Sequence, residues 1–91
     1  MKKEKYEFLE CNRMGGVQRL YRFENGYGAS VIKNMFSYGG NEGLWELAVI
    51  EFEDGDIEKF NIVYTTPVTD DVIGHLTEKE VDVLLAQIDA L

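Results

Sequence analysis

The chain has 91 residues, of which 45% are hydrophobic and 29% charged, and it carries a net charge of −8 at pH 7. This length and balance predict a single globular domain over residues 1–91 and exclude an intrinsically disordered chain. The acidic charge argues against direct nucleic-acid binding, and no apolar run reaches the ~20 residues of a membrane-spanning helix, so we expect neither nucleic acid nor membrane as a partner.

The N-terminal third is predicted to form three strands. Residues 6–13 alternate partly between apolar and polar side chains, and residues 14–16 (MGG) then break the pattern, as a turn does. Two further β-rich segments follow at residues 17–23 and 27–33. We therefore expect an antiparallel arrangement from the start of the chain.

The turn between the last two of these segments contains Asn25 and Gly26. Asn-Gly is typical of a type I′ hairpin, because both central residues of that turn need positive φ. The resulting register places Phe23 opposite Gly28. An aromatic ring would then cover a glycine within the strand.

A second hairpin is predicted over residues 44–52 and 57–64, with a two-residue turn at Asp54 and Gly55. Its register makes one face apolar and the other mostly polar, as a half-buried antiparallel sheet requires. The apolar face would contain three cross-strand pairs: Trp45 with Tyr64, Leu47 with Ile62, and Val49 with Phe60.

The tip of this hairpin is strongly acidic. In the predicted register two glutamates would face each other, which destabilises a sheet by up to ~1 kcal/mol and favours a flared tip. The spacing is not that of a calcium-binding loop, and alternation would point these carboxylates to both faces, so a solvated tip is favoured over a cation site. The acidic residues are Glu51, Glu53, Asp54, Asp56 and Glu58, with Glu51 expected opposite Glu58.

The C-terminal part is predicted to be helical. Pro67 ends the sheet, and residues 69–74 are expected to form a short helix that begins at Thr69 and closes at Gly74. Thr77 and Glu80 have the spacing of a capping box. The last helix then carries one apolar stripe: Val81, Leu84, Leu85, Ile88 and Leu91.

Strands first and helices last predict an α+β domain. We expect an antiparallel β-meander of four or five strands, with a short helix and a C-terminal helix packed on one face. Residues 69–91 also resemble a helix–turn–helix, but the final helix has four acidic residues and one lysine, so DNA phosphates would repel it.

No catalytic constellation is predicted. Cys11 and His75 are the single cysteine and the single histidine, so a zinc site of the usual kind cannot form and no internal disulfide is possible. A lone cysteine is more often a small buried side chain than a reactive thiol, and general-base catalysis at His75 needs a partner that the sequence does not name. We expect no enzyme, no metal and no cofactor.

The connection over residues 34–43 is the candidate interaction loop. It is longer than most connections and contains methionine and aromatic residues, which are enriched at the centres of protein interfaces. The alternative is that its aromatic side chains fold back into a small local core. The candidate residues are Met35, Phe36, Tyr38, Gly39 and Gly40.

Three pieces of the sequence, YRFENGYGASV, SYGGNEGLWELAV and TPVTDDVIGHL, together resemble a group of small uncharacterised proteins encoded in bacteriophage and prophage genomes. The resemblance covers roughly residues 19–91. It implies an accessory phage protein acting in the cytoplasm of the bacterial host, and it implies no activity, so no functional residue is transferred.

These observations favour a non-catalytic protein–protein interaction module, such as a host-takeover or anti-defence inhibitor that binds a host or phage protein. One variant is a nucleic-acid mimic, since residues 35–91 contain thirteen acidic and two basic side chains. The alternative class is a homo-oligomeric structural or packaging accessory, in which an exposed sheet edge pairs with a second copy, for instance as a homodimer.

Overall fold

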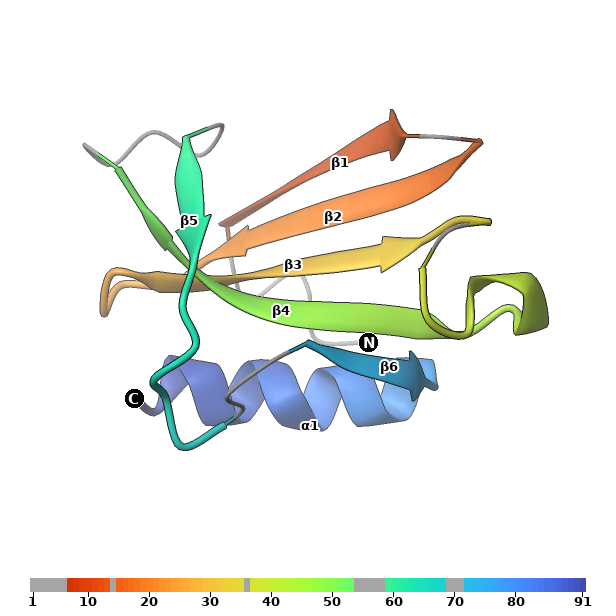
Figure 1. Ribbon diagram of the computed structural model, residues 1–91. Helices are drawn as coiled ribbons and strands as arrows, with labels where there is room; N and C mark the ends of the chain where they lie inside the picture. The colour runs from red at the N-terminus through yellow and green to blue at the C-terminus, as the bar shows by residue number, and fades with distance from the viewer. Residues whose placement is uncertain (1–6, 14, 36, 54–58, 69–71) are drawn as a thin grey trace.

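The computed structural model describes residues 7–13, 15–35, 37–53, 59–68 and 72–91. Within these residues the chain forms a six-stranded antiparallel sheet and one α-helix, so the predicted α+β class is confirmed (Figure 1). The elements are β1 (Glu7–Arg13), β2 (Gly16–Arg22), β3 (Tyr27–Lys33), the 3₁₀ helix η2 (Gly40–Glu42), β4 (Trp45–Phe52), β5 (Phe60–Ile62), β6 (Ile73–Leu76) and α1 (Glu78–Asp89).

The sheet is a meander in the order β1-β2-β3-β4-β5, and β6 joins it by pairing with β4. Two short strands pair with different parts of β4. β5 pairs with residues 50–52, whereas β6 pairs with Trp45 and Leu47. The helix α1 lies across one face of the sheet, beneath β3 and β4 in Figure 1.

The main core lies between the sheet and α1. Alternate residues of β2, β3 and β4 face the helix, which contributes four members of its predicted apolar stripe, Val81, Leu84, Leu85 and Ile88. The fifth predicted member, Leu91, lies beyond the end of α1 and is exposed. Each fully buried aliphatic side chain contributes roughly 1.5–3 kcal/mol. The fully buried members include Tyr21, Val31, Leu47, Val49, Val81, Leu85 and Ile88.

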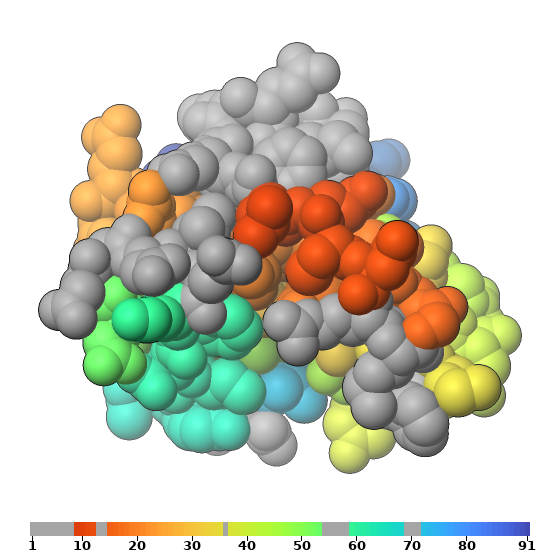
Figure 2. Space-filling model, turned by 90° about the horizontal axis from the view of Figure 1, so that it is seen from above, coloured from red at the N-terminus to blue at the C-terminus, as the bar shows by residue number. Residues whose placement is uncertain are grey.

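The opposite face of the sheet is also partly buried. Leu20 and Ile50 point away from α1 and are nevertheless almost inaccessible. The sheet curls, so that β1 and β5 rise on the side away from the helix, and a view from that side shows these two strands at the surface (Figures 1 and 2).

The turn between β2 and β3 differs from the predicted type I′ hairpin. Phe23 N donates to Tyr27 O at 3.0 Å, and Gly26 N donates to Phe23 O at 3.3 Å. Gly26 has a φ of +89°, whereas Asn25 does not have positive φ. This geometry is a three-residue loop built from a type I turn and a left-handed glycine.

The longer loop shifts the register by one residue, so Arg22 rather than Phe23 lies opposite Gly28. The observed register buries Tyr21 and Phe23 in the core between the sheet and α1. An aromatic ring does cover Gly28, but it belongs to Phe52: a Cβ at Gly28 would lie 2.5 Å from Phe52 Cε2. Burial of Tyr21 and Phe23 therefore outweighs the local preference of Asn-Gly for a type I′ turn.

The register of the β4–β5 hairpin was also predicted wrongly. Ile50 pairs with Ile62 and Phe52 with Phe60, and Glu53 N donates to Lys59 O at 2.8 Å. The connection therefore spans residues 54–58, which lie outside the described part of the chain, in place of a two-residue turn. The three predicted pairs do not form.

β6 replaces part of the predicted short helix. Residues 69–71 lie outside the described residues, but Ile73–Leu76 is a strand that pairs with the half of β4 that β5 leaves open. A β-bulge interrupts this pairing, and His75 within it has a φ of +57°. Backbone pairing with β4 satisfies polar groups that a short isolated helix would leave to solvent.

Candidate binding surface

Hydrogen bonds join several of the described residues of the predicted interaction loop. Asn34 N donates to Ser37 Oγ at 2.9 Å, and Ser37 Oγ donates back to Asn34 O at 3.0 Å. Both residues are buried. Gly40 N donates to Ser37 O, and a side chain at Gly40 would collide with Asn34 O. This end of the loop is therefore a closed turn that has no room for a larger residue.

The loop also packs against β6. His75 N donates to Tyr38 O at 3.1 Å, and Tyr38 N donates to Glu46 Oε1 at 3.0 Å. Gly74 lies directly against Tyr38, because a Cβ at Gly74 would collide with Tyr38 Cβ. Gly39, with a φ of +89°, turns the chain so that both Glu42 N and Leu44 N donate to its carbonyl oxygen.

Two side chains of this fixed loop project into solvent. Met35 is 71% exposed and Tyr38 is 62% exposed. Phe36 lies outside the described residues. Of the five predicted site residues, Gly39 and Gly40 thus shape the loop, while Met35 and Tyr38 are available for contact. The alternative that the aromatic side chains fold back into a local core is wrong for Tyr38, because its side chain is exposed.

The acidic tip is described only in part. Glu51 and Glu53 are exposed, and Glu51 pairs with Asn61, so the predicted opposition of Glu51 and Glu58 is absent. Asp54, Asp56 and Glu58 lie outside the described residues. Over the described ranges, no three His, Cys, Asp or Glu side chains come together as a metal site.

Cys11 and His75 lie apart from each other in the fold. Cys11 is half-buried on β1, and its Sγ donates to Gln18 Oε1 at 3.8 Å. The Gln18 amide in turn donates to Ser30 Oγ at 3.0 Å. Cys11 thus belongs to a polar chain across β1, β2 and β3, on the face away from α1, while His75 is exposed in the bulge of β6.

Arg19 forms a charged cluster that sequence reasoning did not identify. Its Nε lies 2.9 Å from Glu10 Oε1, and its Nη1 lies 3.3 Å from Glu78 Oε1 at the start of α1. The guanidinium also stacks over buried Trp45, 4.4 Å from the ring centroid, and Lys33 Nζ lies 4.5 Å from the same centroid. This cluster connects β1, β4 and α1.

The local environment shifts the pKa values of Tyr21 and Glu80. Burial raises the pKa of Tyr21, an effect that the neighbouring Arg19 partly opposes. Hydrogen bonds from the Thr77 backbone and side chain lower the pKa of Glu80. The capping box predicted from Thr77 and Glu80 is thereby confirmed, with Glu80 N donating to Thr77 Oγ1 at 3.2 Å.

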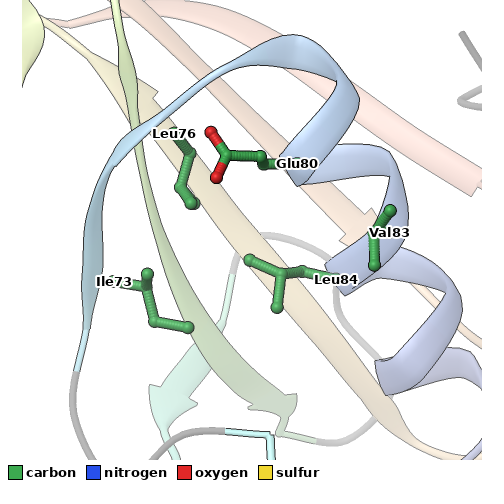
Figure 3. Close-up of a pocket in the computed structure, with 5 residues that line it drawn as sticks. All are labelled: Ile73, Leu76, Glu80, Val83 and Leu84. Atoms are coloured by element: carbon green, nitrogen blue, oxygen red, sulfur yellow. The ribbon is translucent and has the colours of Figure 1, made fainter.

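An open apolar groove of about 270 Å³ lies between β6 and α1 (Figure 3). Sequence reasoning missed it because residues 69–74 were expected to form a short helix, and no strand was expected at residues 73–76. The sequence contained one signal for an apolar surface here, because Val83 is an apolar residue outside the predicted stripe of the last helix. In the structure Val83 is 55% exposed. The lining residues are Ile73, Leu76, Glu80, Val83 and Leu84.

Comparisons of the chain with protein-family models, with curated proteins and with solved structures found no match. In the described ranges, no helix has the length and apolar character needed to cross a membrane.

Proposed function

We propose that this protein is a non-catalytic binding module that contacts a protein partner through Tyr38 and Met35. The observation that supports the proposal is that the Tyr38 side chain is exposed while both its backbone N–H and its backbone C=O are hydrogen-bonded. Tyr38 N is bonded to Glu46 and Tyr38 O to His75 N, while the side chain is 62% exposed.

A fixed anchor of this kind favours association. A flexible loop loses conformational freedom when it binds, whereas a loop already held in one conformation avoids much of that cost. Tyrosine adds a large contact area at small side-chain entropy, and both tyrosine and methionine are enriched at interface centres. The two exposed side chains are three residues apart in the same loop.

The partner we propose is a host or phage protein in the bacterial cytoplasm. Support for this comes from the resemblance of residues 19–91 to small phage-encoded proteins, and a role as a host-takeover or anti-defence inhibitor would fit it. The resemblance bears on context alone, so the choice of contact surface depends on the geometry of the loop.

Site-specific photo-crosslinking tests the proposal. A photoreactive phenylalanine analogue is placed at position 35, at position 38 or, as a control, at position 64, and the chain is expressed in bacterial cells. Tyr64 is a matched control because it is also an exposed tyrosine, at 52%. We expect the same adduct from positions 35 and 38 and none from position 64.

Mass spectrometry of the adduct identifies what was captured. An adduct with another protein, which then binds the purified chain in solution, supports the proposal. An adduct with a second copy of the chain favours the homo-oligomeric alternative. Equal adducts from positions 38 and 64, or none from positions 35 and 38, would contradict a binding surface at this loop.

A further inference from the structure

The groove between β6 and α1 has the size and lining of a site for a peptide side chain. Leu84 points from α1 toward Ile73 on β6, and Leu76 projects into the same space (Figure 3). Its volume of about 270 Å³ lies below the range typical of small-molecule sites, which is ~300–1,000 Å³. The groove is open to solvent, and Val83 in its lining is exposed.

Glu80 supplies a fixed negative charge at one end of this groove. Its Oε1 accepts hydrogen bonds from Thr77 N at 3.0 Å and from Thr77 Oγ1 at 3.1 Å, which hold the side chain in place. The same donors lower its pKa, so the carboxylate is ionised at neutral pH. Among the described residues that line the groove, Glu80 is the one with a charged side chain.

We propose that this groove binds a segment of a partner protein in which an apolar side chain lies next to a lysine or arginine. The apolar side chain fills the space between Ile73 and Leu84, and the cation meets Glu80. Charge complementarity selects this occupant: α1, which forms one wall of the groove, carries four acidic side chains and one lysine, so this wall attracts a basic segment.

This surface is separate from the Tyr38 loop, and its test does not need the natural partner. Three acetylated octapeptides serve as probes: GSLLKKSG, GSLLEESG and GSSSKKSG. Each is titrated into the ¹⁵N-labelled protein at neutral pH and low salt, to a peptide concentration of about 10 mM, which detects dissociation constants in the millimolar range. We expect the leucine–lysine peptide alone to shift the amide resonances of Ile73, Leu76 and Leu84.

A pair of charge-neutralising variants tests the role of Glu80. Glu80→Gln keeps a side chain that is compatible with the capping box. Glu24→Gln removes the same charge from an exposed residue beside Asn25, at the opposite end of α1. We expect Glu80→Gln to weaken binding of the leucine–lysine peptide about two- to fivefold, as loss of an exposed ion pair does, and Glu24→Gln to leave it unchanged.

Three results would overturn the proposal. The first is the absence of amide shifts in the groove with the leucine–lysine peptide. The second is equal binding of the leucine–glutamate peptide, which would show that charge does not select the occupant. The third is an equal loss of affinity in Glu80→Gln and Glu24→Gln, which would reduce the effect to net charge.

Discussion

Asn25 caps the C-terminal end of α1: its Nδ2 donates to the carbonyl oxygen of Ile88 at 2.8 Å. The same amide group reaches Asp89 O at 3.3 Å, and its Oδ1 accepts from Tyr27 N at 3.0 Å. Asn25 therefore shapes the β2–β3 turn and satisfies carbonyl groups at the end of the helix. This second role explains why asparagine occupies a position that does not have positive φ.

Removing this cap should destabilise the fold. We expect Asn25→Ala to lower the free energy of unfolding by about 1 kcal/mol, the net value of a typical hydrogen bond. Asn25→Asp should cost more, because it also places a negative charge at the negative end of the helix dipole. Urea denaturation measures both, with exposed Asn12→Ala as the control. Equal stability of Asn25→Asp and wild type would contradict the capping role.

Position 74 is expected to tolerate no side chain, because the side chain of Tyr38 packs directly against Gly74. Gly74→Ala should destabilise the protein by about 1–3 kcal/mol, the usual cost of overpacking. The collision is with Tyr38 Cβ, so it should be relieved in the Tyr38→Gly background. A double-mutant cycle measured by thermal or urea unfolding gives the coupling. Additive effects of the two substitutions would show that the loop and β6 do not pack as described.

The capping box of α1 gives a prediction for acidic pH. Thr77→Ala should cost about 1 kcal/mol, while Thr77→Ser should be nearly neutral. Because the folded-state pKa of Glu80 is lowered, ionised Glu80 stabilises the fold above its unfolded pKa, and this contribution is lost as the pH falls through the folded pKa. The stability difference between wild type and Glu80→Gln should thus be present at pH 7, begin to fall near the unfolded glutamate pKa of about 4.3, and be lost once the pH is below the lowered folded-state pKa. A difference that persists at lower pH would contradict this.

Tyr21 gives a prediction for alkaline pH. Burial raises its folded-state pKa above the unfolded value, so its neutral form stabilises the fold at pH values below the unfolded pKa. That stability should be lost as the pH rises from about 10 toward the folded pKa, since only the unfolded chain releases the proton there. Denaturation of wild type and Tyr21→Phe across this window measures the effect. Identical pH slopes would show that burial does not protect the phenol.

The sequence predicted those elements whose signals are local. The capping box at Thr77 and the helical stripe from Val81 to Ile88 both belong to α1, and both are present, whereas Leu91 at the end of the predicted stripe is exposed. The predicted hairpin registers were wrong because burial in the tertiary core decides the register. In the β2–β3 hairpin, Tyr21 and Phe23 pack between the sheet and α1, and the Asn-Gly signal carries no information about that packing.

The candidate site was only partly predictable, because some of its features depend on local sequence and others on tertiary contacts. The composition of residues 34–43 indicated a surface loop, and Met35 and Tyr38 are indeed exposed. The backbone of Tyr38 is bonded to the Glu46 side chain and to His75 N on β6. The contact with β6 joins segments that are far apart in the sequence, so local patterns could not predict it. The groove beside α1 requires residues 73–76 to form a strand, and the sequence predicted a short helix ending at Gly74 followed by a junction, so the groove could not be inferred.

The central claim is that exposed Tyr38 on a fixed loop anchors a protein partner. Its most direct test is the dissociation constant of the crosslinked partner for wild type, Tyr38→Ala and Tyr64→Ala, measured by calorimetric titration at low and high salt. We expect Tyr38→Ala to weaken binding by about 2 kcal/mol or more, roughly 30-fold, as loss of an interface hot spot does. Tyr64→Ala should stay within about twofold of wild type, and salt should change the affinity little. Equal affinities for the two variants, or binding that salt abolishes without any effect of Tyr38→Ala, would contradict the claim.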